Sequence, residues 1–246
     1  MSTAPPLTSP PAADTIAANL DRVRAGIADA CHRAHRNPAE VTLIAVSKVH
    51  PAEVILEAYA AGQRHFGENR VQEMQTKHDA VRDLAGAKFH LIGPLQNNKT
   101  GRAAELFHSV DTLAEEKTAR RLAAAATALG RTLPVLVEVK LSHEEAKHGC
   151  APADLPALLE IVSSLDGLSL SGLMTVPPWS EDPELARPYF QQLRALRDAH
   201  QAAFPSLQEL SIGMSNDFAV AIEEGSTAVR IGTAIFGSRP RPPLTE

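Results

Sequence analysis

The amino-acid sequence predicts an α/β fold, a single closed (β/α)8 TIM barrel with an extra N-terminal helix. Two observations lead to this prediction: eight short apolar segments alternate with helical patterns, and no linker is long enough to separate two domains. Strands that alternate with helices form parallel βαβ units. Eight such units in a chain of 246 residues fit a closed barrel.

The first predicted element is a helix over 15–36, in which Ile16, Leu20, Val23 and Ile27 recur at helical spacing. The predicted strands cover residues 42–46, 65–67, 89–92, 107–110, 134–139, 168–173, 209–212 and 228–231. The predicted helices between and after them cover residues 52–61, 71–84, 100–106, 114–129, 153–165, 183–203 and 217–224. A doubly wound open sheet is the alternative, but it usually has fewer strands, and the first strand lacks the G-x-G-x-x-G fingerprint.

Composition limits the class of protein. The chain is 44% hydrophobic and 4% aromatic, which suits layers of sheet and helix with an aliphatic core. Cys31 and Cys150 form no disulfide or metal pattern, which favours a reducing compartment. The net charge of -5 argues against a nucleic-acid partner.

The ends of the chain are predicted to be tails. Residues 1–14 are rich in Pro, Ala, Ser and Thr and lack the basic and apolar regions of a signal peptide, so we expect a disordered tail. The barrel is expected over 15–239, with a short tail at 240–246. No apolar run approaches the roughly 18 residues of a membrane span, so a cytoplasmic protein without a membrane partner is expected.

Lys48 ends the first apolar run, Leu43-Ile44-Ala45-Val46-Ser47, where the chain leaves the sheet. Burial disfavours the charged form of a lysine. A neutral amine is the form that makes a Schiff base with an aldehyde. Considered alone, such a lysine is more often solvated at its charged end.

Polar residues follow most of the other predicted strands, at the barrel end where active sites lie. These residues are Glu68-Asn69, His90, the run 93–97, Asp111, Lys140, Met174-Thr175, the run 213–217, Arg230 and Gly232-Thr233. Each has an ordinary explanation, since Ser, Asn and Asp cap helices, glycines make turns, and a histidine can be a satisfied core residue.

The loops after strands seven and eight carry the most specific pattern. Gly213-Met214-Ser215 opens a helix, which presents backbone N–H groups and a hydroxyl. Gly232-Thr233 adds a second such backbone and hydroxyl. Barrel enzymes frequently bind phosphate at these two loops. A phosphate site opposite the amine of Lys48 fits pyridoxal 5′-phosphate (PLP), which carries an aldehyde and a phosphate on one ring.

Six motifs along the chain closely resemble the pyridoxal-phosphate homeostasis proteins, which are related to the N-terminal barrel of alanine racemase. The motifs cover residues 45–48, 67–73, 90–99, 172–175, 211–217 and 229–237. The resemblance extends from about Ala18 to Arg239. It implies a fold-type III PLP barrel.

The resemblance also implies the roles of individual residues. Lys48 matches the Schiff-base lysine, which would hold PLP as an internal aldimine, and Arg230 matches the arginine that faces the pyridine nitrogen. Ser215, Gly232 and Thr233 match phosphate-binding positions, Met214 lies in the same loop, and Asn69 matches a position that lines the pocket. Lys140 stands where the family usually has asparagine, and Lys147 matches the lysine of the following K-x-G pattern.

Three functions follow from these residues. The first is a PLP-binding protein of intracellular vitamin B6 homeostasis, which would hold the cofactor and deliver it to apo-enzymes. This function is favoured because an arginine beside the pyridine nitrogen weakens the ring as an electron sink. In addition, Tyr59 and Tyr189 are predicted on helices, which leaves no obvious second base. An amino-acid racemase using His90 or Lys147 is the alternative, and a sugar-phosphate aldolase or isomerase is a more distant one.

A monomer is the default expectation, and no metal is expected.

Overall fold

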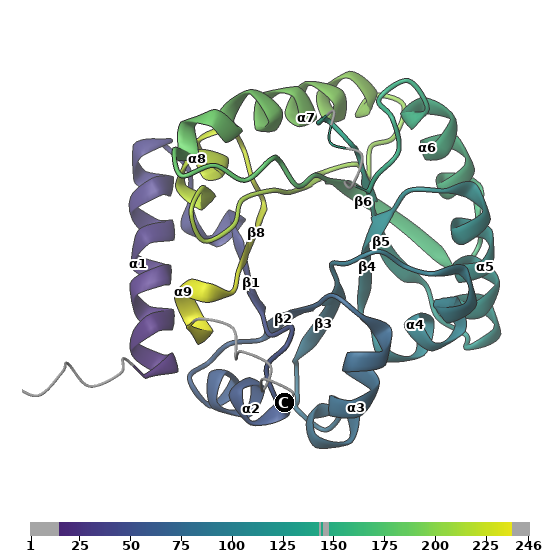
Figure 1. Ribbon diagram of the computed structural model, residues 1–246. Helices are drawn as coiled ribbons and strands as arrows, with labels where there is room; N and C mark the ends of the chain where they lie inside the picture. The colour runs from purple at the N-terminus through teal and green to yellow at the C-terminus, as the bar shows by residue number, and fades with distance from the viewer. Residues whose placement is uncertain (1–14, 143, 145–147, 238–246) are drawn as a thin grey trace, which may run out of the picture.

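The computed structural model describes residues 15–142, 144 and 148–237, and in these residues eight parallel strands close into one barrel (Figure 1). Each strand pairs with the next along the chain, and β8 pairs with β1. The strands are β1 (Thr42–Val46), β2 (His65–Glu68), β3 (Lys88–Leu91), β4 (Ser109–Leu113), β5 (Leu133–Glu138), β6 (Leu168–Met174), β7 (Glu209–Ser211) and β8 (Ala228–Ile231).

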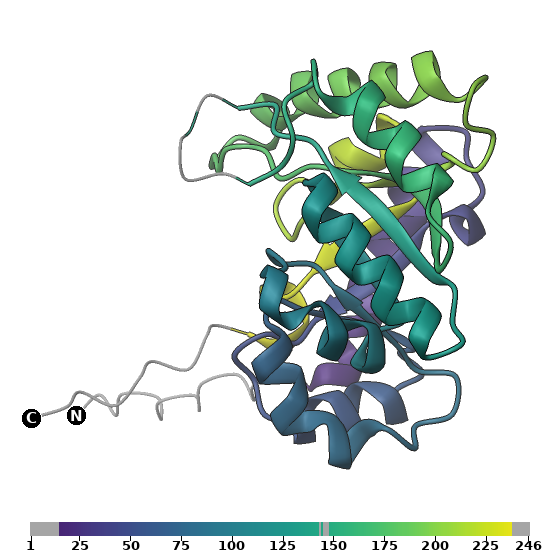
Figure 2. The ribbon, with the colours of Figure 1, turned by 90° about the vertical axis from the view of Figure 1, so that its right-hand side faces the viewer.

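Helices surround the barrel on its outside, as the side view shows (Figure 2). The α-helices are α1 (Ile16–Arg33), α2 (Ala52–Ala60), α3 (Val71–Val81), α4 (Thr100–Leu106), α5 (Glu116–Ala128), α6 (Leu155–Ser164), α7 (Arg187–His200), α8 (Phe218–Glu223) and α9 (Thr233–Phe236). Three short 3-10 helices complete the described elements: η1 (Pro38–Glu40), η2 (Asn97–Lys99) and η3 (Pro183–Ala186).

The predicted barrel is confirmed, with a strand at each of the eight predicted apolar runs. The main shift is at β4, which begins at Ser109 and ends at Leu113, so Asp111 lies in the middle of the strand and not at its end. The short α9 and the separation of η3 from α7 were not predicted. The predicted tails at 1–14 and 240–246 lie outside the described residues.

The extra N-terminal helix α1 lies on the flank of the barrel, beside α8 and α9 (Figure 1). It buries Leu20, Val23 and Ile27 there, which is why its apolar residues recur at helical spacing. The Asn19 side-chain amide donates to the Ile235 carbonyl oxygen at 2.8 Å, which ties α1 to α9. The helix therefore supports the seam where β8 meets β1.

Both cysteines, Cys31 and Cys150, are free and buried. Burial raises the pKa of the Cys150 thiol to about 11. Among the described residues, no helix combines the length and the apolar character that crossing a bilayer requires.

We predict that Leu20→Ala lowers the free energy of unfolding by about 2–5 kcal/mol, because it opens a cavity under α1. Leu56→Ala is the matched control, since Leu56 lies on the outer side of α2 with 38% of its surface exposed. The control substitution should lower the free energy of unfolding by under about 1 kcal/mol. Urea unfolding of both variants checks this, and equal losses would show that α1 does not depend on its buried face.

Candidate functional site

A cavity of about 460 Å³ lies at the carboxyl ends of the strands, and we call it the mouth cavity. The seven residues predicted to hold the cofactor all line it. They are Lys48, Asn69, Met214, Ser215, Arg230, Gly232 and Thr233. Parallel strands point their carboxyl ends to one side of the barrel, so residues far apart in sequence meet at this end.

Lys48 follows β1 and is half-buried in the wall of the mouth cavity. The backbone turns sharply just after it, because Val49 has a φ of 62°, a left-handed conformation that is uncommon for a β-branched residue. The His50 N–H closes this turn by donating to the Ser47 carbonyl oxygen at 3.2 Å. The strained turn needs support from its surroundings.

A buried ion cluster behind Lys48 supplies that support. The Lys77 ammonium on α3 donates to the Ser47 carbonyl oxygen at 3.0 Å, and to Oε1 of Glu68 and Oε1 of Glu73 at 2.8 Å each. The Ser47 hydroxyl donates to Glu68 Oε1 at 2.7 Å, while Glu73 Oε1 accepts from the Val49 N–H. The cluster therefore holds the chain on both sides of Lys48.

The charges of this cluster depend on one another. Glu68 is fully buried, and burial raises the pKa of its carboxyl, whereas the Lys77 ammonium and the Ser47 hydroxyl oppose that rise. A buried ion pair contributes little net stability, but removal of one partner leaves an uncompensated charge. The buried carboxylates therefore need the positive charge of Lys77. Through the same hydrogen bonds, Lys77 fixes the position of the Lys48 backbone.

Arg230 on β8 points into the barrel and has only 4% of its surface exposed. Its Nη1 donates to the carbonyl oxygen and the hydroxyl of Ser211 at 2.6 and 2.7 Å, and its Nη2 donates to the Thr175 carbonyl oxygen at 2.9 Å. Burial lowers the pKa of Arg230, and the carboxylates of Asp111, Glu138 and Asp217 oppose this change. An arginine stays charged in proteins, so a fixed positive charge faces the cavity.

The loop after β7 turns tightly at Gly213, whose φ is 96°. A Cβ at this position would lie 2.6 Å from the Ala221 Cβ, so only glycine fits. Asp217 Oδ1 accepts from the Met214 N–H, and burial raises the pKa of Asp217 while this bond and Arg230 oppose the rise. The bond fixes the turn that carries Ser215.

The loop after β8 approaches β1 closely. A Cβ at Gly232 would lie 3.2 Å from the Val46 carbonyl oxygen. The N–H groups of Ile235 and Phe236 donate to the Gly232 carbonyl oxygen at 2.9 Å each. The first N–H groups of a helical turn lack acceptors within that turn, so those of Thr233 and Ala234 remain available for a ligand.

The segment after β6 forms a further side of the mouth cavity through Val176, Trp179 and Ser180. Trp179 is the single tryptophan of the chain and has 73% of its surface exposed. The Asn216 side-chain amide donates to the carbonyl oxygens of Ser180 and Glu181 at 2.9 and 3.3 Å. This contact joins the loops that follow β6 and β7.

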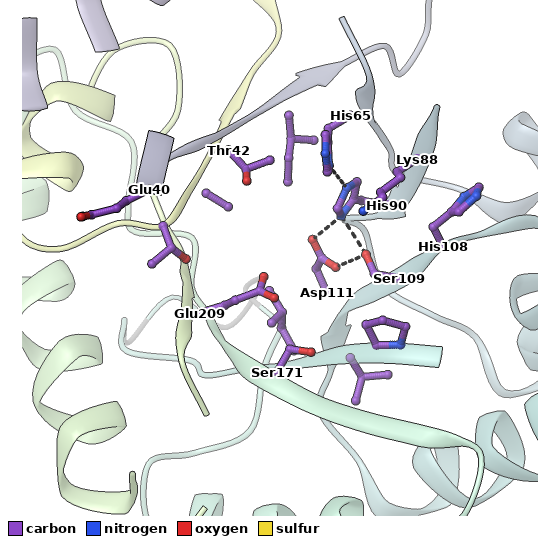
Figure 3. Close-up of a pocket in the computed structure, with 16 residues that line it drawn as sticks. Glu40, Thr42, His65, Lys88, His90, His108, Ser109, Asp111, Ser171 and Glu209 are labelled. Carbon is purple, nitrogen blue, oxygen red and sulfur yellow. Dashed lines mark hydrogen bonds and ion pairs between the residues drawn. The ribbon is translucent and has the colours of Figure 1, made fainter. Parts of the chain in front are cut away.

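Two residues expected at this end of the barrel lie elsewhere. His90 and Asp111 line a different cavity at the amino ends of the strands (Figure 3). His90 is the third residue of the short strand β3, and Ile92, two residues later on the same face, reaches the mouth. His90 is therefore ruled out as a base in the mouth cavity.

Two lysines after β5, Lys140 and Lys147, were also considered from the sequence, and the structure describes the first of them. The Lys140 N–H donates to the Cys150 carbonyl oxygen at 2.9 Å, and Lys140 is not among the described residues that line the mouth cavity. Lys147 lies outside the described residues.

Sequence reasoning missed three residues of this region: Lys77, Glu138 and His148. Glu138 ends β5 and lines the mouth cavity with His148, which is exposed. A signal for Lys77 was present, because Val71, Met74, Lys77 and Val81 share one buried stripe of α3.

Comparisons with known proteins identify the family of this chain. The family described as alanine racemase, N-terminal domain, matches residues 13–240. The pyridoxal phosphate homeostasis protein of Pseudomonas aeruginosa is 46% identical over 92% of this chain and 96% of its own length. The Aquifex aeolicus protein of the same name is 45% identical over 89% of this chain and 96% of its own length. The chain belongs to the pyridoxal phosphate homeostasis protein family.

Solved structures support the family's fold. PipY of Synechococcus elongatus, in a structure described as having PLP bound, matches with a TM-score of 0.81 and 40% identity, over 91% of this chain and all of that one. Alanine racemase of Clostridium difficile matches with a TM-score of 0.71 and 15% identity, over 95% of this chain and 59% of that one, which shows a common fold.

We predict that Lys77→Met destabilises the protein by about 3–5 kcal/mol at neutral pH, since it leaves Glu68 without its cation. The loss should shrink as the pH falls. Without Lys77 the folded-state pKa of Glu68 lies above its unfolded value, so the folded protein takes up a proton that relieves the penalty. Urea unfolding at several pH values measures both effects.

Lys117→Met is the matched control, because Lys117 is exposed on α5. A surface substitution of this kind should change the free energy of unfolding by no more than about 0.5 kcal/mol. If Lys77→Met costs no more than Lys117→Met, the ion cluster does not support the turn at Lys48.

Proposed function

We propose that this protein binds PLP reversibly in the mouth cavity and acts in cellular PLP homeostasis, holding the cofactor and supplying it to apo-enzymes. One observation carries the proposal. A lysine at the end of β1 and two hydroxyl-bearing loops after β7 and β8 line the same cavity. The relatives named as homeostasis proteins and the PLP-bound PipY structure support the choice of cofactor.

The residues present fit the cofactor. Bound PLP supplies an aldehyde that condenses with a primary amine, with loss of water, and a phosphate that needs hydrogen-bond donors. Lys48 offers the amine. Ser215 and Thr233 offer hydroxyls, the α9 backbone offers N–H groups, and Gly232 leaves room for close approach. The volume of about 460 Å³ is typical of small-molecule sites.

Arg230 explains why we favour storage over catalysis. We assign its guanidinium to the pyridine-nitrogen side of the cofactor, and Asn69 to the wall of the same pocket. A fixed positive charge there disfavours a proton on that nitrogen. The ring then withdraws electrons weakly, which makes carbanion chemistry difficult. The hydrogen bonds to Ser211 and Thr175 keep the arginine from moving away.

The described side chains around the mouth cavity include no tyrosine. Tyr59 lies on α2, where its hydroxyl donates to the Ala85 carbonyl oxygen at 2.9 Å, and Tyr189 lies on α7. His148 is exposed and lines the mouth cavity, so it is a candidate base for a racemase. The competing function can therefore be tested directly.

We predict that the protein incubated with PLP turns yellow and that borohydride fixes the cofactor on Lys48. Lys48→Ala should lose the fixed label and bind PLP roughly tenfold or more weakly, with the loops after β7 and β8 keeping some affinity. Peptide mapping by mass spectrometry locates the label. Lys117→Ala is the control and should be labelled like the parent protein, while a label on another lysine would refute the proposed site.

We also predict little exchange at the α-carbon of an amino acid. PLP-loaded protein incubated with L-alanine in deuterium oxide should show slow or absent exchange by NMR, because the cavity pairs a weak electron sink with an exposed histidine. Exchange at about 10 s⁻¹, a typical enzyme rate, would favour the racemase. If His148→Ala then abolished the exchange, His148 would be identified as its base.

A further inference from the structure

A second cavity lies inside the barrel at the amino ends of the strands, and we call it the lower cavity (Figure 3). Its volume is about 500 Å³, close to that of the mouth cavity, and the two share none of their lining residues. It is lined by the first residues of six strands: Thr42, His65, Lys88, Ser109, Glu209 and Ala228.

The polar lining of the lower cavity is unusual for this position. The interior of such barrels is normally filled by layers of branched apolar side chains, and the amino-end face serves stability. Here His65, His90, Asp111 and Glu209 surround open space, and Asp111 has only 2% of its surface exposed. Burying a carboxylate costs free energy that an apolar side chain would not cost. The proposed PLP function uses none of these residues.

A chain of hydrogen bonds orients one side of the cavity (Figure 3). The Ser109 hydroxyl donates to Asp111 Oδ1 at 2.6 Å, so its oxygen accepts from His90 Nδ1 at 2.7 Å. His90 Nδ1 also lies 3.5 Å from Asp111 Oδ2, and a hydrogen bond of 2.9 Å joins His90 Nε2 to His65 Nδ1. The chain runs from Asp111 through Ser109 and His90 to His65.

Two further polar side chains, those of His108 and Lys88, line the lower cavity. His108 Nδ1 accepts from the Phe89 N–H at 3.1 Å, so its proton is on Nε2. Burial and neighbouring positive charges lower the pKa of His108, and they lower that of His65 to about 4, so both rings are neutral at pH 7. Lys88 is exposed and brings an ammonium group to the cavity lining.

The charges are separated across the cavity. Figure 3 shows His65, Lys88 and His108 on one side, Glu209 and Glu40 on the other, and Asp111 between them. Burial and the Asp111 carboxylate raise the pKa of Glu209, while His90 and Lys88 oppose this rise. The Asp111 and Glu209 carboxylates therefore repel each other. A ligand cation between Asp111 and Glu209 would relieve this repulsion.

We propose that the lower cavity binds a small amino-carboxylate zwitterion, with its ammonium group between Asp111 and Glu209 and its carboxylate on Lys88 and His108. A zwitterion matches both the carboxylates and Lys88, whereas a dication leaves Lys88 unmatched and a dianion meets the carboxylates of Glu40, Asp111 and Glu209. The proposal is independent of PLP binding, because the two cavities have separate linings.

Isothermal titration calorimetry with ligands of matched length tests the charge requirement. The probes are 4-aminobutanoate, 1,4-diaminobutane and butanedioate, which differ only in their end groups, with L-alanine as a shorter zwitterion. We expect saturable binding of at least one zwitterion, tenfold or more tighter than the diamine and the dicarboxylate. Equal binding of all probes, or no saturable binding of either zwitterion at millimolar concentration, would overturn the proposal.

Variants locate the binding. Glu209→Gln and Lys88→Met, both at exposed positions, should each weaken the zwitterion about tenfold while the melting temperature stays close to that of the parent. Lys48→Ala should bind it as the parent does. Loss of binding in Lys48→Ala would place the zwitterion in the mouth cavity and refute the lower site, whether or not PLP binds as proposed.

Discussion

The pairing of β1 with β8 is the constraint on which the mouth cavity depends. Ile44 and Ala45 pair with Arg230 and Ile231, which places the end of the first strand beside the end of the last. The amine of Lys48 and the loop of Thr233 meet only because this seam is closed. Helix α1 supports the seam from outside, through its contacts with α8 and α9 and the bond from Asn19 to Ile235.

Much of this arrangement could be predicted from the sequence. Alternating apolar runs and helical patterns predicted eight parallel strands, and such strands bring their carboxyl ends together. That rule alone gathers Lys48, Asn69 and Arg230 at one end of the barrel. The glycines also had a physical reason that the structure confirms, since Gly213 needs a positive φ and Gly232 lies against β1.

The remaining features could not be predicted because they depend on how deep a strand residue lies along the barrel axis, or on which helix residue is buried. Every residue of β4 is buried, so the strand lacks the alternation of polar and apolar residues that would mark its ends. The predicted strand therefore ended too early, which placed Asp111 at its end. His90 and Ile92 point to the same face of β3, but only the structure shows which end of the barrel each reaches. Lys77 was missed because a lysine in a helix is normally solvated, whereas here three acceptors surround it.

Trp179 gives the molecule a built-in optical reporter. Because it is the single tryptophan of the chain and lies at the rim of the mouth cavity, indole emission excited selectively reports on that end of the barrel alone. A chromophore bound beside it quenches this light by energy transfer. Ligands in the lower cavity have no indole next to them, so the occupancy of the two ends can be followed separately in one unlabelled sample.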